Sequence, residues 1–272
     1  MSTAGALLRA CHPEPALAVT AIAAALAVGA GAPVLGVTAA FGAGQLATGW
    51  SNDYLDRDRD SRTARQDKPL VQGRLASSTL GRAAAAAVLA CVPLSLALGP
   101  RAGVAHLLAV ASALSYNAGL KSTPLSWLPY AVSFGLVPNI VVLAAPDGGP
   151  APLWATAAGA LLGVGAHLAN TLPDLEDDLA TGVRGLPHRL GRPVSTGLTA
   201  VLLLAATALL TFGPGRVGAA GVAALLLAGG LTTVGVVLAR RPGSRAAFRA
   251  CVAVAVVDVA LLVASGARLS GR

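Results

Sequence analysis

Acidic residues gather in two short segments of this 272-residue chain. In chain order, the two segments contain Asn52, Asp53, Asp56 and Asp60, and then Asn170, Asp174 and Asp178. Both share the spacing N-x3-D-x3-D, and steps of four residues place side chains on one face of an α-helix. Carboxylate and amide oxygens are the ligands that hard divalent cations prefer. The spacing therefore predicts two half-sites for cations, each at the end of a helix.

Basic residues accompany the acidic segments and predict a phosphate partner. They are Arg65, Lys68, Lys121, Arg184 and Arg189. Among hard cations, Mg²⁺ typically keeps several waters and bridges one or two carboxylates to substrate phosphates. Zinc is disfavoured because no Cys or His pair stands at ligand spacing. Acids for a metal ion and bases for phosphate together indicate a diphosphate substrate.

Two other interpretations fit the acids in part. The first segment partly matches a calcium loop, with alternating acids over 56–60, but Ser61 stands where glycine is needed and Asp67 where glutamate is expected. Alternatively, the acids are solvated loop charges, which the repeated spacing makes less attractive. Three acids lie off the shared helical faces: Asp58, Glu176 and Asp177. For these three, the interpretation as solvated loop charges fits as well as a role in a cation site.

The elements that carry these segments are apolar. The chain is 55% hydrophobic and 12% charged, with a mean hydropathy of +0.69, whereas soluble proteins carry about 25% charged residues. Apolar runs long enough to cross a bilayer recur along it, and Pro, Gly and charged residues separate them. We predict an all-α polytopic membrane protein, a single domain over 1–272 with nine transmembrane helices around a central cavity. The predicted spans are 14–31, 33–52, 78–98, 102–119, 124–145, 151–172, 194–213, 217–239 and 246–266.

The basic residues predict the orientation of these spans. Most of the twenty Lys and Arg residues fall in alternate loops, which places those loops in the cytoplasm, the N-terminus inside and the C-terminus outside. Both acidic segments then lie in cytoplasmic loops over the active site. Basic residues confined to short loops argue against nucleic-acid binding, and no obligate protein partner is evident. The predicted substrate is a lipid-like diphosphate at the membrane surface.

Taken together, these motifs resemble the UbiA superfamily of intramembrane prenyltransferases over nearly the whole chain. That family has nine transmembrane helices and two Asp-rich motifs, N-D-x-x-D-x-x-x-D and D-x-x-x-D, which stand here at 52–60 and 174–178. It also shows a basic residue with Pro and then Gly, found here in 68–73, and a Y-x-x-x-L-K element, found here at 116–121. Its G-x-R-x-L-P-x-R-x-G pattern is found here at 182–191.

The resemblance implies roles for individual residues. It assigns one Mg²⁺ to Asp53, Asp56 and Asp60, a second Mg²⁺ to Asp174 and Asp178, assistance to Asn52 and Asn170, and the diphosphate to Lys68, Lys121 and Arg184. The implied activity is Mg²⁺-dependent transfer of a prenyl group from an allylic diphosphate to a hydrophobic acceptor, an aromatic compound or quinone precursor, through a carbocation. A UbiA-type terpene cyclase is the alternative enzyme. A transporter is disfavoured because its acids should lie near mid-membrane.

Further residues are candidates for the cavity wall. Aromatic faces can stabilise a carbocation, which suggests a supporting role for Tyr116. Trp127, Tyr130 and Phe134 share one face of the fifth span, although interfacial anchoring explains Trp127 and Tyr130 as well. Neither the acceptor nor the length of the prenyl chain follows from the sequence.

The roles of two residues within the predicted spans are open, and a proline affects the helix next to Asp174. His167 is three residues before Asn170 and is predicted to face the site, as an acceptor-side base or as a structural hydrogen-bonded histidine. Asp258 lies inside the ninth span with no evident partner. Pro173 directly precedes Asp174 and is predicted to kink or end that helix.

Overall fold

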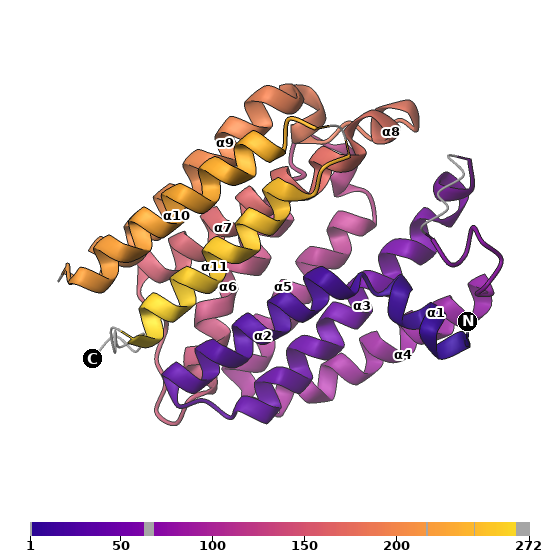
Figure 1. Cartoon of the computed structure of the whole chain (residues 1–272). Helices are drawn as coiled ribbons and strands as arrows, with labels where there is room; N and C mark the ends of the chain where they lie inside the picture. The colour runs from indigo at the N-terminus through magenta and orange to yellow at the C-terminus, as the bar shows by residue number, and fades with distance from the viewer. Residues whose placement is uncertain (1, 63–67, 216, 242, 265–272) are drawn as a thin grey trace.

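The computed structural model describes residues 2–62, 68–215, 217–241 and 243–264. These residues form helices and connecting turns, with no strand among them (Figure 1). In chain order the helices are α1 (Thr3–Ala10), α2 (Pro13–Ala30), α3 (Val34–Arg62), α4 (Ser77–Leu96), α5 (Pro100–Asn117), η1 (Leu120–Ser122), α6 (Leu128–Ala144), α7 (Leu153–Thr171), η2 (Leu172–Asp174), α8 (Leu175–Ala180), α9 (Leu186–Phe212), α10 (Ala219–Leu238) and α11 (Ala246–Ala264).

Each predicted apolar span overlaps one long helix. Five of these helices, α2, α4, α9, α10 and α11, are long and apolar enough to cross a membrane. The number of membrane crossings therefore remains a prediction, because the other helices fall short of that criterion. α3 differs most from its predicted span, since it continues as one helix through the first acidic segment to Arg62. α9 begins at Leu186, before its predicted span, and Gly191 interrupts its helical backbone with φ of 76°.

The long helices form a ring. Consecutive helices pack against one another from α2 to α7 and from α9 to α11, α7 packs against α9, and α11 returns to α2. Figure 1 shows α11 lying between α10 and α2, which closes the ring. The polypeptide thereby surrounds a central cavity to which most of the long helices contribute side chains.

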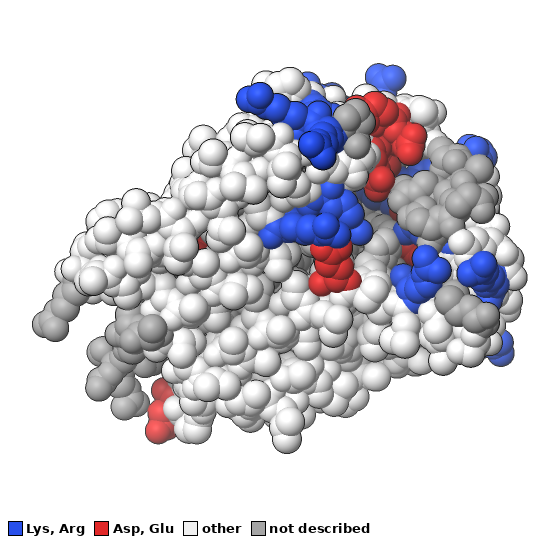
Figure 2. Space-filling model, in the orientation of Figure 1, with Lys and Arg blue, Asp and Glu red and all other residues white. Residues whose placement is uncertain are grey.

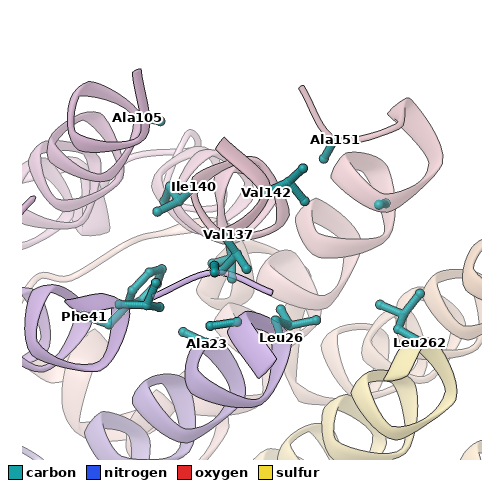
Figure 3. Close-up of a cluster of buried hydrophobic side chains, with 14 of the residues drawn as sticks. Ala23, Leu26, Phe41, Ala105, Val137, Ile140, Val142, Ala151 and Leu262 are labelled. Carbon is teal, nitrogen blue, oxygen red and sulfur yellow. The ribbon is translucent and has the colours of Figure 1, made fainter. Parts of the chain in front are cut away.

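Small residues let the helices approach closely. Figure 3 shows Ala23 and Leu26 of α2 packed near Phe41 of α3 and Val137 of α6 in the main core cluster. A Cβ atom on Gly163 of α7 would lie 2.4 Å from the Tyr130 carbonyl oxygen of α6. Because only glycine fits there, the backbones of α6 and α7 come together as in small-xxx-small membrane pairs.

Most of the outer surface is apolar. Leucines on several helices are largely exposed, including Leu35 at 87%, Leu153 at 86% and Leu226 at 73%. Such broad apolar exposure would be unfavourable in water and suits a lipid environment. Charged side chains gather instead at the end of the bundle where α8 and α1 lie (Figure 2).

Candidate active site

The first acidic segment occupies the last turns of α3. Asp53, Asp56 and Asp60 are buried, at 2%, 6% and 4% exposure, because steps of three and four residues turn them toward the same side of the helix. Asp58 points the other way, with its side chain 78% exposed. The helix therefore carries three buried acids on the predicted shared face and a solvated acid off that face.

Both lysines of the chain are buried against these acids. The Lys68 amine lies 2.5 Å from an Asp53 oxygen, and the Lys121 amine, from η1, pairs with Asp56. Burial alone would raise the pKa of Asp53, but a hydrogen bond with His12 and the charge of Lys68 outweigh it and lower that pKa. Burial lowers the pKa of the Lys121 amine, and Asp56 partly offsets this effect. Buried charges of opposite sign stabilise one another here.

Arg59 joins the two acidic segments. Its guanidinium lies 2.8 Å from Asp56, 3.8 Å from Asp60 and 3.8 Å from Asp178 of α8. Segments separated by more than a hundred residues thus face each other across a single cation. Burial raises the pKa of Asp60 more than the nearby Lys68 lowers it, so this group of carboxylates favours additional positive charge.

The second acidic segment is not one continuous helix. α7 ends at Thr171, Pro173 lies in the short helix η2, and Asp174 is the N-cap of α8. The break predicted at Pro173 is therefore confirmed. Asn170, Asp174 and Asp178 lie in three successive elements and do not share one helical face. Asn170 lines the central cavity, whereas Asp178 approaches His188 at 3.3 Å as well as Arg59.

The other charged side chains of this region lie on the surface of the protein. Glu176 and Asp177 are exposed, and Glu176 pairs with Arg192 at 2.8 Å, which lowers the pKa of Glu176. Arg184 and Arg189 are also exposed, and the Arg189 side chain donates to the Arg184 carbonyl. Of the predicted phosphate-binding residues, the structure therefore gathers the two lysines around the acids. Arg65 lies outside the described residues.

An aromatic layer lies below the acids. Tyr130 meets Tyr116 edge-on at 5.2 Å and stacks on Phe134 at 6.1 Å, and all three line the cavity. His167 contacts both tyrosine rings and forms a 2.9 Å hydrogen bond with Ser126. His167 is buried behind the tyrosines and is not among the cavity-lining residues. Trp127 is also absent from that lining, whereas Tyr130 lies within it.

The cavity has a volume of about 290 Å³. Its polar end is lined by residues from three helices, α3, α5 and α7, and by the N-cap residue of α2: His12, Asn52, Tyr116, Asn117 and Asn170. Alanine, leucine and valine side chains line most of the remainder, down to Ala155 and Leu262. The site therefore places buried charge beside a long apolar space.

Sequence reasoning missed several residues of this site, including Arg59, Asn117 and His12. Arg59 carried a local signal, since it follows Asp56 by three residues on the same helix. Asn117 accepts from Asn52 at 3.1 Å and donates to the Thr48 carbonyl, and only its position beside Tyr116 pointed to it. His12 lies 2.8 Å from Asp53 and has a left-handed backbone with φ of 55°, an unusual conformation outside glycine that often marks functional positions.

The model of the UbiA prenyltransferase family matches residues 15–261. The chain belongs to this family. It is therefore a prenyltransferase, and the resemblance seen in its motifs is confirmed. None of the curated proteins matches it significantly.

Solved structures establish the UbiA fold for the whole bundle. A UbiA homologue from Aeropyrum pernix K1 in its apo form has 21% identity and a TM-score of 0.71, over 93% of this chain and 98% of that one. A UbiA homologue from Archaeoglobus fulgidus bound to GPP and Mg²⁺ has 18% identity and a TM-score of 0.70, over 97% and 98%. The structure of digeranylgeranylglyceryl phosphate synthase has 15% identity and a TM-score of 0.64, over 98% and 99%.

The donor set of this UbiA member fits Mg²⁺. Within the described ranges, no three His, Cys, Asp or Glu side chains are already gathered around one point, because Lys68, Lys121 and Arg59 pair with the acids. The donors are nevertheless oxygens from two opposed segments, and the Arg59 guanidinium already lies between them as a cation. Oxygen donors around a positive centre are what a hard divalent ion requires.

Proposed function

We propose that this enzyme transfers a prenyl group from an allylic prenyl diphosphate to a hydrophobic acceptor, an aromatic compound or quinone precursor, and releases diphosphate. The observation that carries the proposal is the meeting of both acidic segments and both lysines at the polar end of an apolar cavity. The Archaeoglobus fulgidus homologue bound to GPP or DMAPP with Mg²⁺ shares this fold and supports the substrate class.

The acids would hold the metal. We assign one Mg²⁺ to the α3 carboxylates and a second to the α8 region; the residues are Asp53, Asp56 and Asp60, and then Asp174 and Asp178, with Asn52 and Asn170 assisting. When bound, Mg²⁺ supplies positive charge that stabilises the departing diphosphate. Cation binding would compete with the present ion pairs and release the lysine amines.

The bases would then bind the diphosphate. Lys68 and Lys121 exchange their carboxylate partners for phosphate oxygens, which are equally good acceptors for a charged amine. Arg59 remains between the two segments, where it can contact the same oxygens. We also assign diphosphate binding to Arg65, Arg184 and Arg189, which would add positive charge to the site. The negatively charged end of the substrate is thereby fixed, and its hydrocarbon end enters the cavity.

The reaction itself needs a water-free space beside these charges. The allylic C–O bond breaks, its electron pair leaves with the diphosphate, and a carbocation forms at C1. The rings of Tyr116, Tyr130 and Phe134 line that space and stabilise positive charge through their faces. An acceptor carbon or heteroatom then bonds to C1 and loses a proton. We assign His167 a supporting role, because it contacts the two tyrosine rings from behind.

The membrane arrangement belongs to the same proposal. We infer nine membrane crossings by one domain over 1–272, with the N-terminus cytoplasmic and the C-terminus outside. The active site then faces the cytoplasm, where soluble diphosphates are delivered, while the apolar cavity opens to lipid-soluble compounds. The proposed partners are the prenyl diphosphate, a small hydrophobic acceptor and the bilayer; we assign neither a nucleic acid nor an obligate protein partner.

The test mixes detergent-solubilised protein with allylic diphosphates of several chain lengths, with and without Mg²⁺. Pyrophosphate release and product mass are measured for the wild type, Asp56→Asn and Asp174→Asn. We expect Mg²⁺-dependent release that both substitutions abolish, because each removes a proposed metal ligand. Asp58→Asn and Asp177→Asn are matched controls, since these acids are exposed on the same segments, and they should retain activity.

Two results would contradict the proposal in different ways. A cyclised hydrocarbon as the product would show a terpene cyclase in place of a transferase. The absence both of release and of Mg²⁺-dependent diphosphate binding would refute the diphosphate chemistry altogether. Binding is measured separately because a transferase can hold its diphosphate until an acceptor arrives.

A further inference from the structure

A small recess adjoins the central cavity between α3, α5 and α6. Its volume is about 50 Å³, which suits one hydroxyl or methyl group but not a ring, since a water molecule occupies about 30 Å³ of the liquid. The recess exists because α3 has a glycine here. A Cβ atom on Gly44 would lie 2.9 Å from Val110 Cγ2 and 3.3 Å from His106 Nε2. Several residues line both spaces, among them Gln45, Thr48, Ser133 and Phe134.

One imidazole nitrogen faces this recess. His106 of α5 is 2% exposed, and its Nδ1 lies 2.7 Å from the Ser95 hydroxyl. That hydroxyl donates its single proton to the Cys91 carbonyl at 2.6 Å, so Nδ1 carries a hydrogen and donates to Ser95. Nε2 of the neutral ring is then a hydrogen-bond acceptor. It has no partner among the described residues, and they do not enclose it completely.

Gln45 of α3 supplies the second polar group. Its side chain is half-buried, lines both spaces, and makes no hydrogen bond within the described part of the chain. Its amide therefore offers two N–H donors and a carbonyl acceptor. The nearby hydroxyls have already used their protons: Thr48 donates to the Gly44 carbonyl at 2.9 Å, and Ser133 donates to the Ala109 carbonyl at 2.8 Å.

The charges around the recess select among ligands. No Lys or Arg is among the described residues that line the cavity or the recess. A carboxylate placed there would lose its hydration without a compensating cation, and the bound diphosphate would repel it. A quinone carbonyl would turn its oxygen toward the lone pair of His106 Nε2. A hydroxyl group satisfies both side chains, because it donates to Nε2 and accepts from the Gln45 amide.

The recess lies within reach of the proposed reaction. Gln45 precedes Asn52 by seven residues on α3, which separates them by roughly 10 Å along the helix. A ring whose hydroxyl enters the recess would lie in the central cavity beside Phe134, with its far edge toward the polar end. The prenyl chain keeps a separate route, since the cavity continues to Ala155 and Leu262.

We propose that this recess binds the hydroxyl group of an uncharged hydroxyaromatic acceptor, a phenol or a hydroquinone. The inference rests on the proposed function and narrows its acceptor from hydrophobic compounds in general to those with a hydroxyl and no carboxylate. His106 and Gln45 are positioning residues in this scheme, because they hold the acceptor by its oxygen while a ring carbon reacts.

The experiment uses three ligands that differ at one group each. They are methyl para-hydroxybenzoate, methyl benzoate, which lacks the hydroxyl, and para-hydroxybenzoate, which carries a carboxylate. Each is titrated calorimetrically into detergent-solubilised protein loaded with Mg²⁺ and geranyl S-thiolodiphosphate, a slowly reacting donor analogue, with empty micelles as the blank. We expect the hydroxy ester to bind roughly tenfold more tightly than either of the others, because each loses the equivalent of a buried polar contact.

Variants connect this preference to the recess. Gln45→Leu removes the amide at similar volume and should weaken binding of the hydroxy ester by about tenfold, with methyl benzoate unchanged. Gly44→Ala fills the recess and should reduce binding of the hydroxy ester more than that of methyl benzoate. Gly42→Ala is the matched control on the same helix, because a Cβ atom there has nothing within 4 Å, and it should bind all three ligands like the wild type.

The outcomes separate this inference from the proposed function. Equal affinities of the wild type for the two esters, or a Gln45→Leu variant that weakens both alike, would overturn the inference, as would tighter binding of the carboxylate. Binding of the donor analogue with Mg²⁺ is measured first, without an acceptor. If the donor binds but none of the acceptors does, the inference is wrong while the proposed function stands. If the donor does not bind, the proposed function fails, and this inference fails with it.

Discussion

The buried ion pair between Asp53 and Lys68 can be tested quantitatively. The two side chains are 3% and 10% exposed, and their charged atoms lie 2.5 Å apart. Removing one partner of a buried pair leaves an uncompensated charge, which typically costs about 3–5 kcal/mol. We therefore expect Asp53→Asn and Lys68→Met each to lower the free energy of unfolding by about 3 kcal/mol, at the low end because His12 also contacts Asp53.

The double variant distinguishes the pair from two independent effects. It removes both charges together, so we expect a loss of about 3 kcal/mol instead of about 6, a coupling energy near 3 kcal/mol. The matched control is the pair between Glu176 and Arg192, which has a similar geometry at 2.8 Å, but its glutamate side chain is 67% exposed. Solvent screening should keep the coupling of that surface pair below about 1 kcal/mol.

The assay is denaturant unfolding in detergent micelles without Mg²⁺, followed by intrinsic fluorescence. Additive losses for the two single variants would refute the reasoning. So would a coupling energy no larger than that of the Glu176 control pair. Either result would mean that Lys68 does not compensate Asp53 in the metal-free protein, and that the site is held together by other contacts.

Three further predictions follow from the same structure. Because burial raises the pKa of Asp60, its contribution to stability is lost as the pH rises through the folded-state pKa. Asp60→Asn should therefore unfold at or above the wild-type temperature at pH 7 without Mg²⁺ but gain less than the wild type from added Mg²⁺. A lower midpoint without Mg²⁺ would contradict this. Ser126→Ala loses hydrogen bonds to His167 and to the Leu186 amide, at 2.9 and 2.8 Å, so denaturant unfolding should show a loss of about 1–3 kcal/mol; an unchanged value would argue against this anchor. Gly163→Val should lower the thermal midpoint of unfolding strongly, because the new side chain forces α7 away from the Tyr130 carbonyl. Gly229→Ala is the control: a Cβ atom there has nothing within 4 Å, so this variant should unfold like the wild type.

Local features of this protein follow from its sequence. The spacing of Asp53, Asp56 and Asp60 was sufficient to predict one shared face, because the pitch of a helix relates residues three and four apart regardless of the rest of the fold. Pro173 was sufficient to predict a break, since its ring and missing N–H act on the adjacent turn. Apolar runs of membrane length located the long helices. Each of these signals lies within a few residues of its effect.

Contacts between distant segments did not follow from the sequence. Arg59 is near Asp56 by helical pitch, but its approach to Asp178 depends on how the end of α3 meets α8. The bond of His12 to Asp53 depends on α1 and α2 meeting at the acidic end of α3. The place of Tyr130 in the cavity wall, and of His167 behind it, depends on the close pairing of α6 with α7.

By itself, then, the sequence determined which side chains share a helix face, where helices break and what chemistry the acids and bases can perform. Only the tertiary structure decided that both lysines are buried against α3, that one arginine lies between the two acidic segments, and that Asp258 lines the cavity. The physical reason is that helical geometry acts over a few residues, whereas charge pairing and burial depend on which helices pack together.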